Sequence, residues 1–234
     1  MRSKLSFPIS PSFKQKLLHW SNQFEQVCIL DSNKRNLEPG AKNYELLAAI
    51  DSIETISPSQ NSFETLKNFI DKNNDWVFGH LSYDLKNEVE HLHSEKPDGI
   101  GFPLMRFFVP KYVFTIENEK LEVYYLPELS SQKKIEDLIS KITNFKLPCP
   151  TGRRVTSNFQ LPSIKHRITK EQYITSVQEL QQHIQQGDIY EVNFCQEFYA
   201  EGATIDPVIT YEKLNAVSEA PFSCFYKLSE KHLM

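Results

Sequence analysis

A change of hydrophobic period at Gly187 constrains the fold of this chain more than any other sequence feature. Before it, apolar residues from Tyr173 to Ile184 recur every three or four positions, the spacing of one helix face. Thr169 and Gln172 open the segment with the residue types of a capping box. The pattern therefore predicts an amphipathic helix that ends at the glycine.

Beyond this glycine, apolar and polar residues alternate, which is the pattern of a β-strand. One side carries the apolar residues Tyr190, Val192, Phe194 and Phe198, and the other carries the polar residues Glu191, Asn193, Cys195 and Glu197. We expect a long strand here. Its polar side either faces a substrate or is the solvent-exposed face of an antiparallel strand, and periodicity alone leaves both interpretations open.

The remaining apolar patterns predict both helices and strands. Helices are expected near 13–24, 62–70, 135–142 and 207–214, with Ser12 and Ser62 as N-caps of the first two. Strands are expected at 27–30, 76–78, 106–116, 121–126 and 221–226. Pro110 predicts an edge position or a bulge. We therefore expect an α+β protein with packed, mostly antiparallel sheets and helices on their outer faces.

A break in the apolar pattern divides the chain into separate units. Prolines and a glycine interrupt a polar stretch without apolar period: Pro148, Pro150, Gly152 and Pro162. We predict an N-terminal domain over 1–147, a linker over 148–167, and the truncated start of a second domain over 168–234.

Composition excludes several classes of function. The formal charge of −4 provides no basic field for nucleic acid or anionic membranes. No apolar run has the length of a signal peptide core or a membrane span, so we expect a soluble, cytoplasmic protein. The cysteines are far apart and predict reduced thiols rather than a disulfide framework or a metal site: Cys28, Cys149, Cys195 and Cys224.

Two stretches carry a family resemblance. TKEQYITSVQELQQHIQQGDIYEVNFCQEF, from Thr169, and NAVSEAPFSCFYKL, from Asn215, resemble the opening of the chorismate-binding domain of component I of aminodeoxychorismate and anthranilate synthases. The resemblance is strong over 168–228 and looser in the earlier part, at Leu30-Asp31-Ser32 and at Gly79 with the following Ser-Tyr-Asp-Leu. It implies that the chain is the N-terminal half of such an enzyme.

The resemblance favours the para-aminobenzoate branch over the tryptophan branch. Asn193 and the stretch Ala220-Pro221-Phe222-Ser223 look more like aminodeoxychorismate synthases, since anthranilate synthases more usually have an apolar residue and Pro-Tyr-Met there. It implies amination of chorismate to 4-amino-4-deoxychorismate, with ammonia from a glutamine amidotransferase subunit. It also implies Mg²⁺, a hard cation suited to carboxylates, with ligands that lie outside this chain.

Two sets of site residues follow from the resemblance. Glu191 stands where related synthases usually have glutamine and isochorismate-type enzymes have a general-base lysine. We expect Glu191 as a catalytic candidate in the chorismate pocket and Asn193 as a substrate-binding residue; a carboxylate that only pairs with a basic residue is the alternative. Ser32, Pro221, Phe222 and Ser223 match positions of an L-tryptophan pocket, but they could equally cap a turn and fill the core.

Other interpretations remain open at this point. The chain could belong to an anthranilate synthase component I, act as a noncatalytic tryptophan-binding module, or serve only as an interaction surface. The family's metal-binding glutamates and its Pro-Ile-Lys-Gly-Thr lysine lie beyond Met234, so we expect no turnover by these residues alone.

Overall fold

The computed structural model describes residues 1–33, 44–90, 92–93, 96–148 and 163–234. The chain divides into two compact units, one formed by Met1–Leu147 with Pro207–Met234 and the other by Pro148–Asp206. The sequence predicts a single unit over 168–234, whereas Pro207–Met234 packs with the N-terminal part. The physical reason is that the last strands complete the sheet of the first unit.

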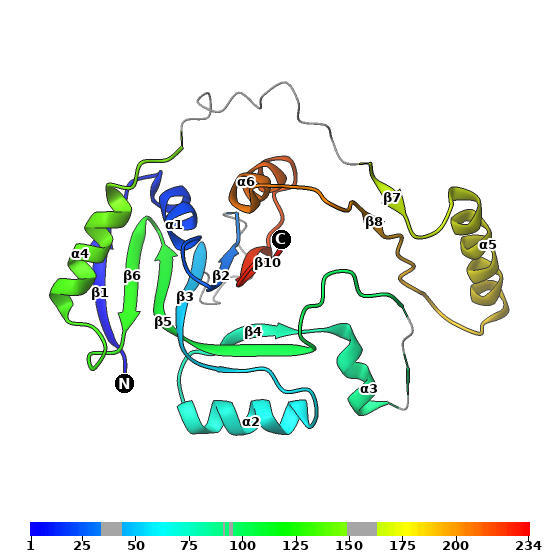
Figure 1. The fold of residues 1–234 in the computed structure, drawn as a ribbon, viewed down its shortest axis with the longest axis horizontal. Coiled ribbons are helices and arrows are strands. Elements are labelled where there is room, and N and C mark those ends of the chain that lie inside the picture. The colour runs from blue at the N-terminus through cyan, green and yellow to red at the C-terminus, as the bar shows by residue number, and fades with distance from the viewer. Residues whose placement is uncertain (34–43, 91, 94–95, 149–162) are drawn as a thin grey trace. The chain divides into compact units, whose positions relative to one another are not determined.

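The first unit is built on an eight-stranded antiparallel sheet (Figure 1). Its order is β1-β6-β5-β3-β2-β9-β10, with β4 also paired to β5. The strands are β1 (Ser3–Pro8), β2 (Gln26–Asp31), β3 (Leu46–Ile56), β4 (Phe78–Leu81), β5 (Met105–Glu117), β6 (Lys120–Tyr125), β9 (Ser223–Leu228) and β10 (Lys231–Leu233). An antiparallel sheet with helices confirms the expected α+β class.

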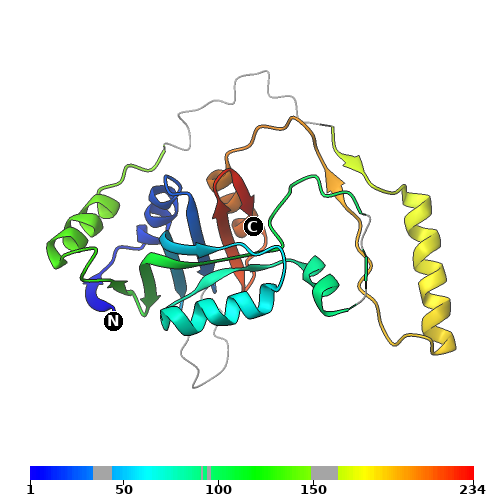
Figure 2. The ribbon, with the colours of Figure 1, turned by 60° about the horizontal axis from the view of Figure 1, so that its bottom comes forward.

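The helices of this unit are short, and three of them cover one face of the sheet. They are α1 (Phe13–Ser21), α2 (Ser62–Asn73), η1 (Tyr83–Leu85), α3 (Lys86–Val89), α4 (Gln132–Thr143) and α6 (Pro207–Val217). Buried residues of α1, α4 and α6 form the main core with β2, β3, β5 and β6. Figure 2 shows these helices on one side of the sheet and α2 on the other.

The predicted hairpin is confirmed in β5 and β6, joined by Asn118 and Glu119, whose φ angles are both positive, at 49° and 61°. Pro110 lies at an irregularity, as predicted. The register of β3 against β5 shifts between Ser52 and Glu54, and Ser52 is the partner of Pro110. Proline has no amide hydrogen to donate, and irregular positions of this kind are where strands accommodate it.

Of two predicted helix caps, Ser12 occupies the N-cap position of α1 as predicted but makes no capping bond, and Ser62 is wrong. Asn61, not Ser62, precedes α2, and the buried Ser62 hydroxyl donates instead to Glu88 Oε1 at 2.5 Å. The cap of α4 is made by Ser131, which accepts a hydrogen bond from the Lys134 amide. At Ser62 a tertiary contact thus replaces the local bond that sequence alone suggests, whereas the Ser12 hydroxyl lies 3.2 Å from the hydroxyl of Ser10.

The second unit holds α5 (Lys170–Gln186) and a two-stranded pair, β7 (Lys165–His166) with β8 (Phe198–Tyr199). The capping box of Thr169 and Gln172 is confirmed, and Gly187 ends the helix at φ 83°. The long strand expected from Tyr190 is wrong, because only Phe198 and Tyr199 pair with another strand. A strand forms only where a partner satisfies its backbone groups.

The predicted linker can be followed only in part, since 149–162 lies outside the described residues, as does Cys149. None of the helices that the structure does describe combines the length and the apolar composition needed to cross a bilayer.

Candidate functional site

Two neighbouring strands of the first unit bring most of the predicted site residues to one end of the sheet. Asp31, the last residue of β2, pairs with Ser223, the first residue of β9. Ser32 follows Asp31, and the Pro221-Phe222 turn precedes Ser223. We call the residues 31–33 and 220–223 the strand-end cluster. Residues that are far apart in the sequence thus become neighbours.

The side-chain amide of Asn33 connects this cluster to α6 through hydrogen bonds. Its Nδ2 donates to Asn215 Oδ1 at 2.9 Å and to the Ala220 carbonyl oxygen at 2.8 Å, while Asn215 Nδ2 donates back to Asn33 Oδ1 at 2.9 Å. Asn33 adopts φ 50°, a left-handed conformation that asparagine tolerates better than most residues. The backbone amide of Asn33 donates to Asp31 Oδ1 at 2.9 Å. The end of β2 is therefore tied directly to α6 and the turn before β9.

The two serines of the cluster are hydrogen-bonded within the protein. Ser32 donates from both its hydroxyl, at 3.2 Å, and its amide, at 3.1 Å, to the carbonyl oxygen of Glu45. The Ser223 hydroxyl lies 2.9 Å from the hydroxyl of Tyr211. Burial raises the pKa of Tyr211, so this phenol stays protonated at neutral pH. Phe222, by contrast, leaves 76% of its surface exposed.

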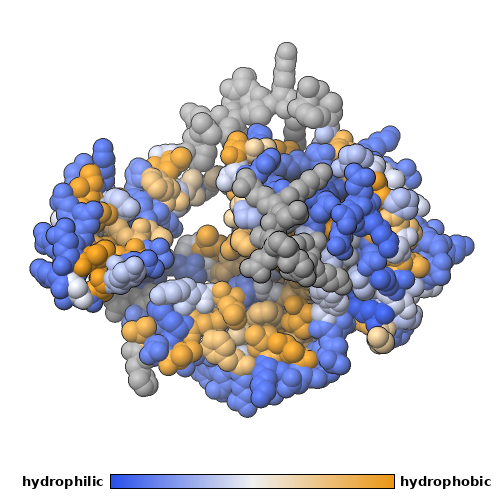
Figure 3. All heavy atoms as spheres, turned by 180° about the vertical axis from the view of Figure 1, so that it is seen from behind, coloured by the Kyte–Doolittle hydropathy of each residue, from blue (hydrophilic) through white to orange (hydrophobic). Residues whose placement is uncertain are grey.

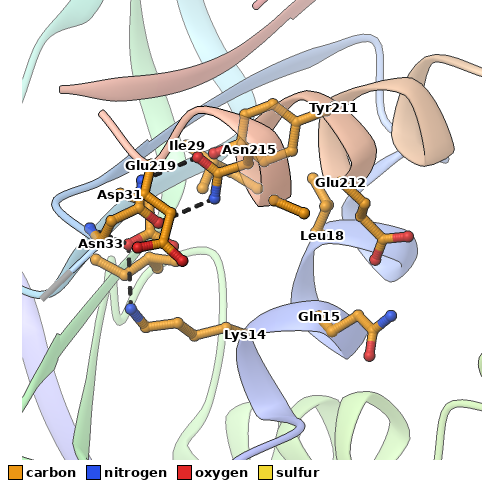
Figure 4. Close-up of a pocket in the computed structure, with 12 residues that line it drawn as sticks. Lys14, Gln15, Leu18, Ile29, Asp31, Asn33, Tyr211, Glu212, Asn215 and Glu219 are labelled. Atoms are coloured by element: carbon orange, nitrogen blue, oxygen red, sulfur yellow. Dashed lines mark hydrogen bonds and ion pairs between the residues drawn. The ribbon is translucent and has the colours of Figure 1, made fainter. Parts of the chain in front are cut away.

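A cleft of about 360 Å³ opens beside the cluster on the helix-covered face (Figure 4). It is lined by Lys14, Gln15, Leu18, Ile29, Asp31, Asn33, Leu46, Tyr211, Glu212, Asn215, Ala216 and Glu219. Lys14 Nζ lies 3.1 Å from Asp31 Oδ1. The lining of this first cavity therefore combines apolar side chains, such as Leu18 and Ile29, with charged ones, such as Lys14 and Glu212.

A second cavity, of about 420 Å³, lies against the other side of β2 and β9. Alternate strand residues face opposite sides, so Leu30 lines the second cavity while Asp31 lines the first. Its walls are largely apolar and aromatic, and they include Cys28, Cys224, Trp76 and Tyr226.

His80 lines the second cavity and has a hydrogen-bond partner at each ring nitrogen. His80 Nδ1 lies 3.1 Å from the Tyr226 hydroxyl, and His80 Nε2 lies 2.9 Å from the Pro103 carbonyl oxygen. Burial raises the pKa of Tyr226, which keeps its hydroxyl neutral and available for this bond. The ring of His80 is therefore held in place from both sides.

Glu191 and Asn193 belong to the second unit, in the exposed irregular segment that follows α5. The Asp188 amide donates to the His183 carbonyl oxygen at 3.0 Å, which closes the helix end. Farther along, the ring of Phe194 stacks on Tyr173 with centroids 5.2 Å apart. Both candidate side chains are exposed to solvent.

No metal site is formed by the residues that the structure describes, since none of their histidine, cysteine, aspartate and glutamate side chains gather in threes around a common point. The Mg²⁺ implied by the resemblance therefore finds no ligand set among them.

Several residues at the site escape prediction from sequence. Lys14 and Asn215 sit on helices whose polar faces look like ordinary solvent-exposed surface, and only the pairing of β2 with β9 brings them together. Asn33 alone had a local signal, because asparagine after Asp31-Ser32 at a strand end is typical of a turn.

Comparison with known proteins shows the family to which this chain belongs. The model of the chorismate binding enzyme family matches residues 12–234, and the chain belongs to that family. Among solved structures, anthranilate synthase component I from Streptococcus pneumoniae superimposes with a TM-score of 0.54 at 19% identity, covering 80% of this chain and 48% of that one. This likeness concerns the fold.

Curated relatives come from both branches of the family. Aminodeoxychorismate synthase component 1 of Salmonella typhimurium is 28% identical over 156 residues, 66% of this chain and 32% of that protein. Anthranilate synthase component 1 of Cereibacter sphaeroides is 26% identical over 160 residues, 64% of this chain and 32% of that protein. The chain spans about one third of the length of these relatives.

Proposed function

We propose that this chain is the N-terminal part of component I of an aminodeoxychorismate synthase. The whole protein would replace a hydroxyl of chorismate by an amino group and form 4-amino-4-deoxychorismate. Ammonia would come from a glutamine amidotransferase subunit. The observation that carries the proposal is the segment after α5, where Asp188-Ile189-Tyr190-Glu191-Val192-Asn193 follows a capped helix in a chain of the chorismate binding enzyme family.

Glu191 is the group to which we assign a chemical role. Its exposed carboxylate can accept a proton from, or hydrogen-bond to, an incoming ammonium or ammonia, whereas the amide of a glutamine can only orient it. Asn193, two positions along, can contribute both a donor and an acceptor to the substrate. Mg²⁺ would be held by residues of the longer protein.

Identifying the product that the complete protein forms tests whether it is an aminodeoxychorismate synthase or an anthranilate synthase. Chorismate with ammonium salt should give 4-amino-4-deoxychorismate, separated by liquid chromatography and identified by mass. Anthranilate, recognised by its fluorescence, would instead establish the second candidate, an anthranilate synthase component I, which the relatives from that branch support.

Glu191→Gln tests the role of the carboxylate. In the complete protein we expect ammonia-dependent kcat to fall about 10²-fold or more, the scale of general acid–base catalysis. Glu179→Gln is the matched control, because Glu179 is an exposed carboxylate on α5. An unchanged rate in Glu191→Gln alongside intact product formation would remove the role but leave the proposed reaction standing.

We further propose that Ser32, Pro221, Phe222 and Ser223 border an L-tryptophan pocket. Support comes from the pairing of β2 with β9, which gathers all four at one end of the sheet. Isothermal titration calorimetry of the chain with L-tryptophan should show binding that Ser223→Ala weakens. Heat equal to that of dilution in the unaltered chain would overturn the assignment and leave these residues a structural role.

A further inference from the structure

Two cysteine side chains meet on the wall of the second cavity. In the antiparallel pairing of β2 with β9, Cys28 lies opposite Tyr226 and Cys224 lies opposite Leu30. The two cysteines are therefore diagonal neighbours on the same face of the sheet, and both line the cavity of about 420 Å³. Both are free thiols.

The two thiols are not equivalent. A hydrogen bond joins their side chains and lowers the pKa of Cys224 below its ordinary value, although burial acts in the opposite direction. The same hydrogen bond, followed by burial, raises the pKa of Cys28 well above its ordinary value. Cys224 is also the more exposed of the pair, since Cys28 is only 5% exposed. Cys224 is thus the more accessible thiol and the expected nucleophile, and Cys28 lies beside it on the same face of the sheet.

We propose that Cys28 and Cys224 form a dithiol that hydrogen peroxide oxidises to an intramolecular disulfide between β2 and β9. The Cys224 thiolate attacks a peroxide oxygen, the O–O bond breaks, and the released hydroxide takes up a proton to form water. The Cys28 sulfur then attacks the sulfenic sulfur, the S–S bond forms, and the S–O bond breaks. Its oxygen leaves as a second water with the Cys28 proton, so two thiols and one hydrogen peroxide give one disulfide and two waters.

Closure of the disulfide requires a local movement at the pair. Diagonal neighbours are farther apart than directly opposite residues, so the two side chains must rotate and the backbone at the start of β9 must shift before the sulfurs reach about 2.05 Å. Neither strand needs to separate from its neighbours, because β2 and β9 are already paired from Gln26 to Asp31. The bridge would adjoin the strand-end cluster, because Cys224 directly follows Ser223.

Peptide mapping of the chain tests the proposal. The reduced protein is treated with hydrogen peroxide, alkylated, digested without reductant and analysed by mass spectrometry. We expect the Cys28 peptide linked to the Cys224 peptide, with a loss of two hydrogens that a reductant reverses. Cys195, which is exposed in the second unit, is the internal control and should instead yield a sulfenic acid that dimedone traps.

Cys28→Ser gives the decisive second measurement. Without its partner, the sulfenic acid of Cys224 should persist and be trapped by dimedone, whereas in the unaltered chain the trapped fraction should be at least 10-fold lower. Circular dichroism checks that the variant is folded. The proposal is overturned if the unaltered chain carries Cys224 as a dimedone adduct or sulfinic acid beside a free Cys28, or if Cys224 does not react; this mapping decides even where the variant fails to fold.

Discussion

The two units of this chain are stabilised in different ways. The first buries a continuous core between its sheet and α1, α4 and α6. The second unit holds the 17-residue helix α5, which has a capping box at its start and a glycine at its end, yet no residue of this helix is buried. Hydrophobic residues of α5 lie at the surface, at the left of Figure 3. Local hydrogen bonds can thus define a helix that buries none of its residues within its own unit, and a helix without such burial is marginal in water.

The largest expected difference between the units comes from truncating apolar side chains. Phe114 in β5 is fully buried and packs against Trp20, with ring centroids 6.4 Å apart. Phe114→Ala should lower the free energy of unfolding by about 3–5 kcal/mol. Leu180→Ala in α5 is the control. Tryptophan fluorescence in a urea titration measures both, because Trp20 and Trp76 lie in the first unit. A similar shift of this transition by both variants would mean that the two units unfold together.

Glycines provide the next contrast. A Cβ on Gly79 in β4 would lie 2.0 Å from the Arg106 carbonyl oxygen and 2.7 Å from Phe107 Cα. Because both are backbone atoms, Gly79→Ala should destabilise the first unit by about 1–3 kcal/mol or more. Around Gly187 a Cβ would meet nothing within 4 Å, so only its φ of +83° opposes alanine. Gly187→Ala should therefore leave the fluorescence transition in place, and a large shift would contradict the separation of the units.

Gln26 offers a change in the stabilising direction. Its side chain is 4% exposed in the first unit, and neither of its amide atoms has a hydrogen-bond partner among the described residues. Gln26→Leu should raise the free energy of unfolding by about 1–2 kcal/mol, because an unpaired buried amide is removed. The matched control is Gln23→Leu, since exposed Gln23 donates to the Trp20 carbonyl oxygen. A loss of stability in Gln26→Leu would reveal a partner for this amide.

The smallest expected effect lies in the second unit. Thr169→Ala removes the side chain that accepts from the Gln172 amide at 3.2 Å and should destabilise α5 by about 1 kcal/mol. Circular dichroism should report lower helicity with an unchanged fluorescence transition. Thr175→Ala, in the exposed middle of the same helix, is the control and should keep or raise the helicity. Equal effects from both variants would mean that the cap is not what holds this helix.

Sequence reasoning succeeded where a feature depends on neighbouring residues. The capping box at Thr169 and the turn through Asn118 need only a few consecutive positions, and both are confirmed. It failed where distant segments decide, as at Ser62, whose hydroxyl bonds Glu88 instead of capping a helix. The alternating segment after Tyr190 satisfied the strand pattern but found no partner strand beyond Phe198 and Tyr199.

The candidate site shows the same division. Ser32 and Ser223 could be proposed only through a family resemblance, because nothing local connects positions so far apart. Asn215, which binds Asn33 reciprocally, and the facing thiols of Cys28 and Cys224 had no sequence signal. Each becomes visible only once β2 and β9 are known to be neighbours.

The pairing of β2 with β9 also has a consequence for how the chain folds during synthesis. Residues 26–31 leave the ribosome early, and β3 can pair with one side of β2 soon afterwards. The other side must wait until residues 223–228 have been made. Until then β2 is an edge strand with unpaired amides and carbonyls, open to pairing with another nascent chain. A strand that lies inside the finished sheet is therefore an exposed edge while the protein is being made.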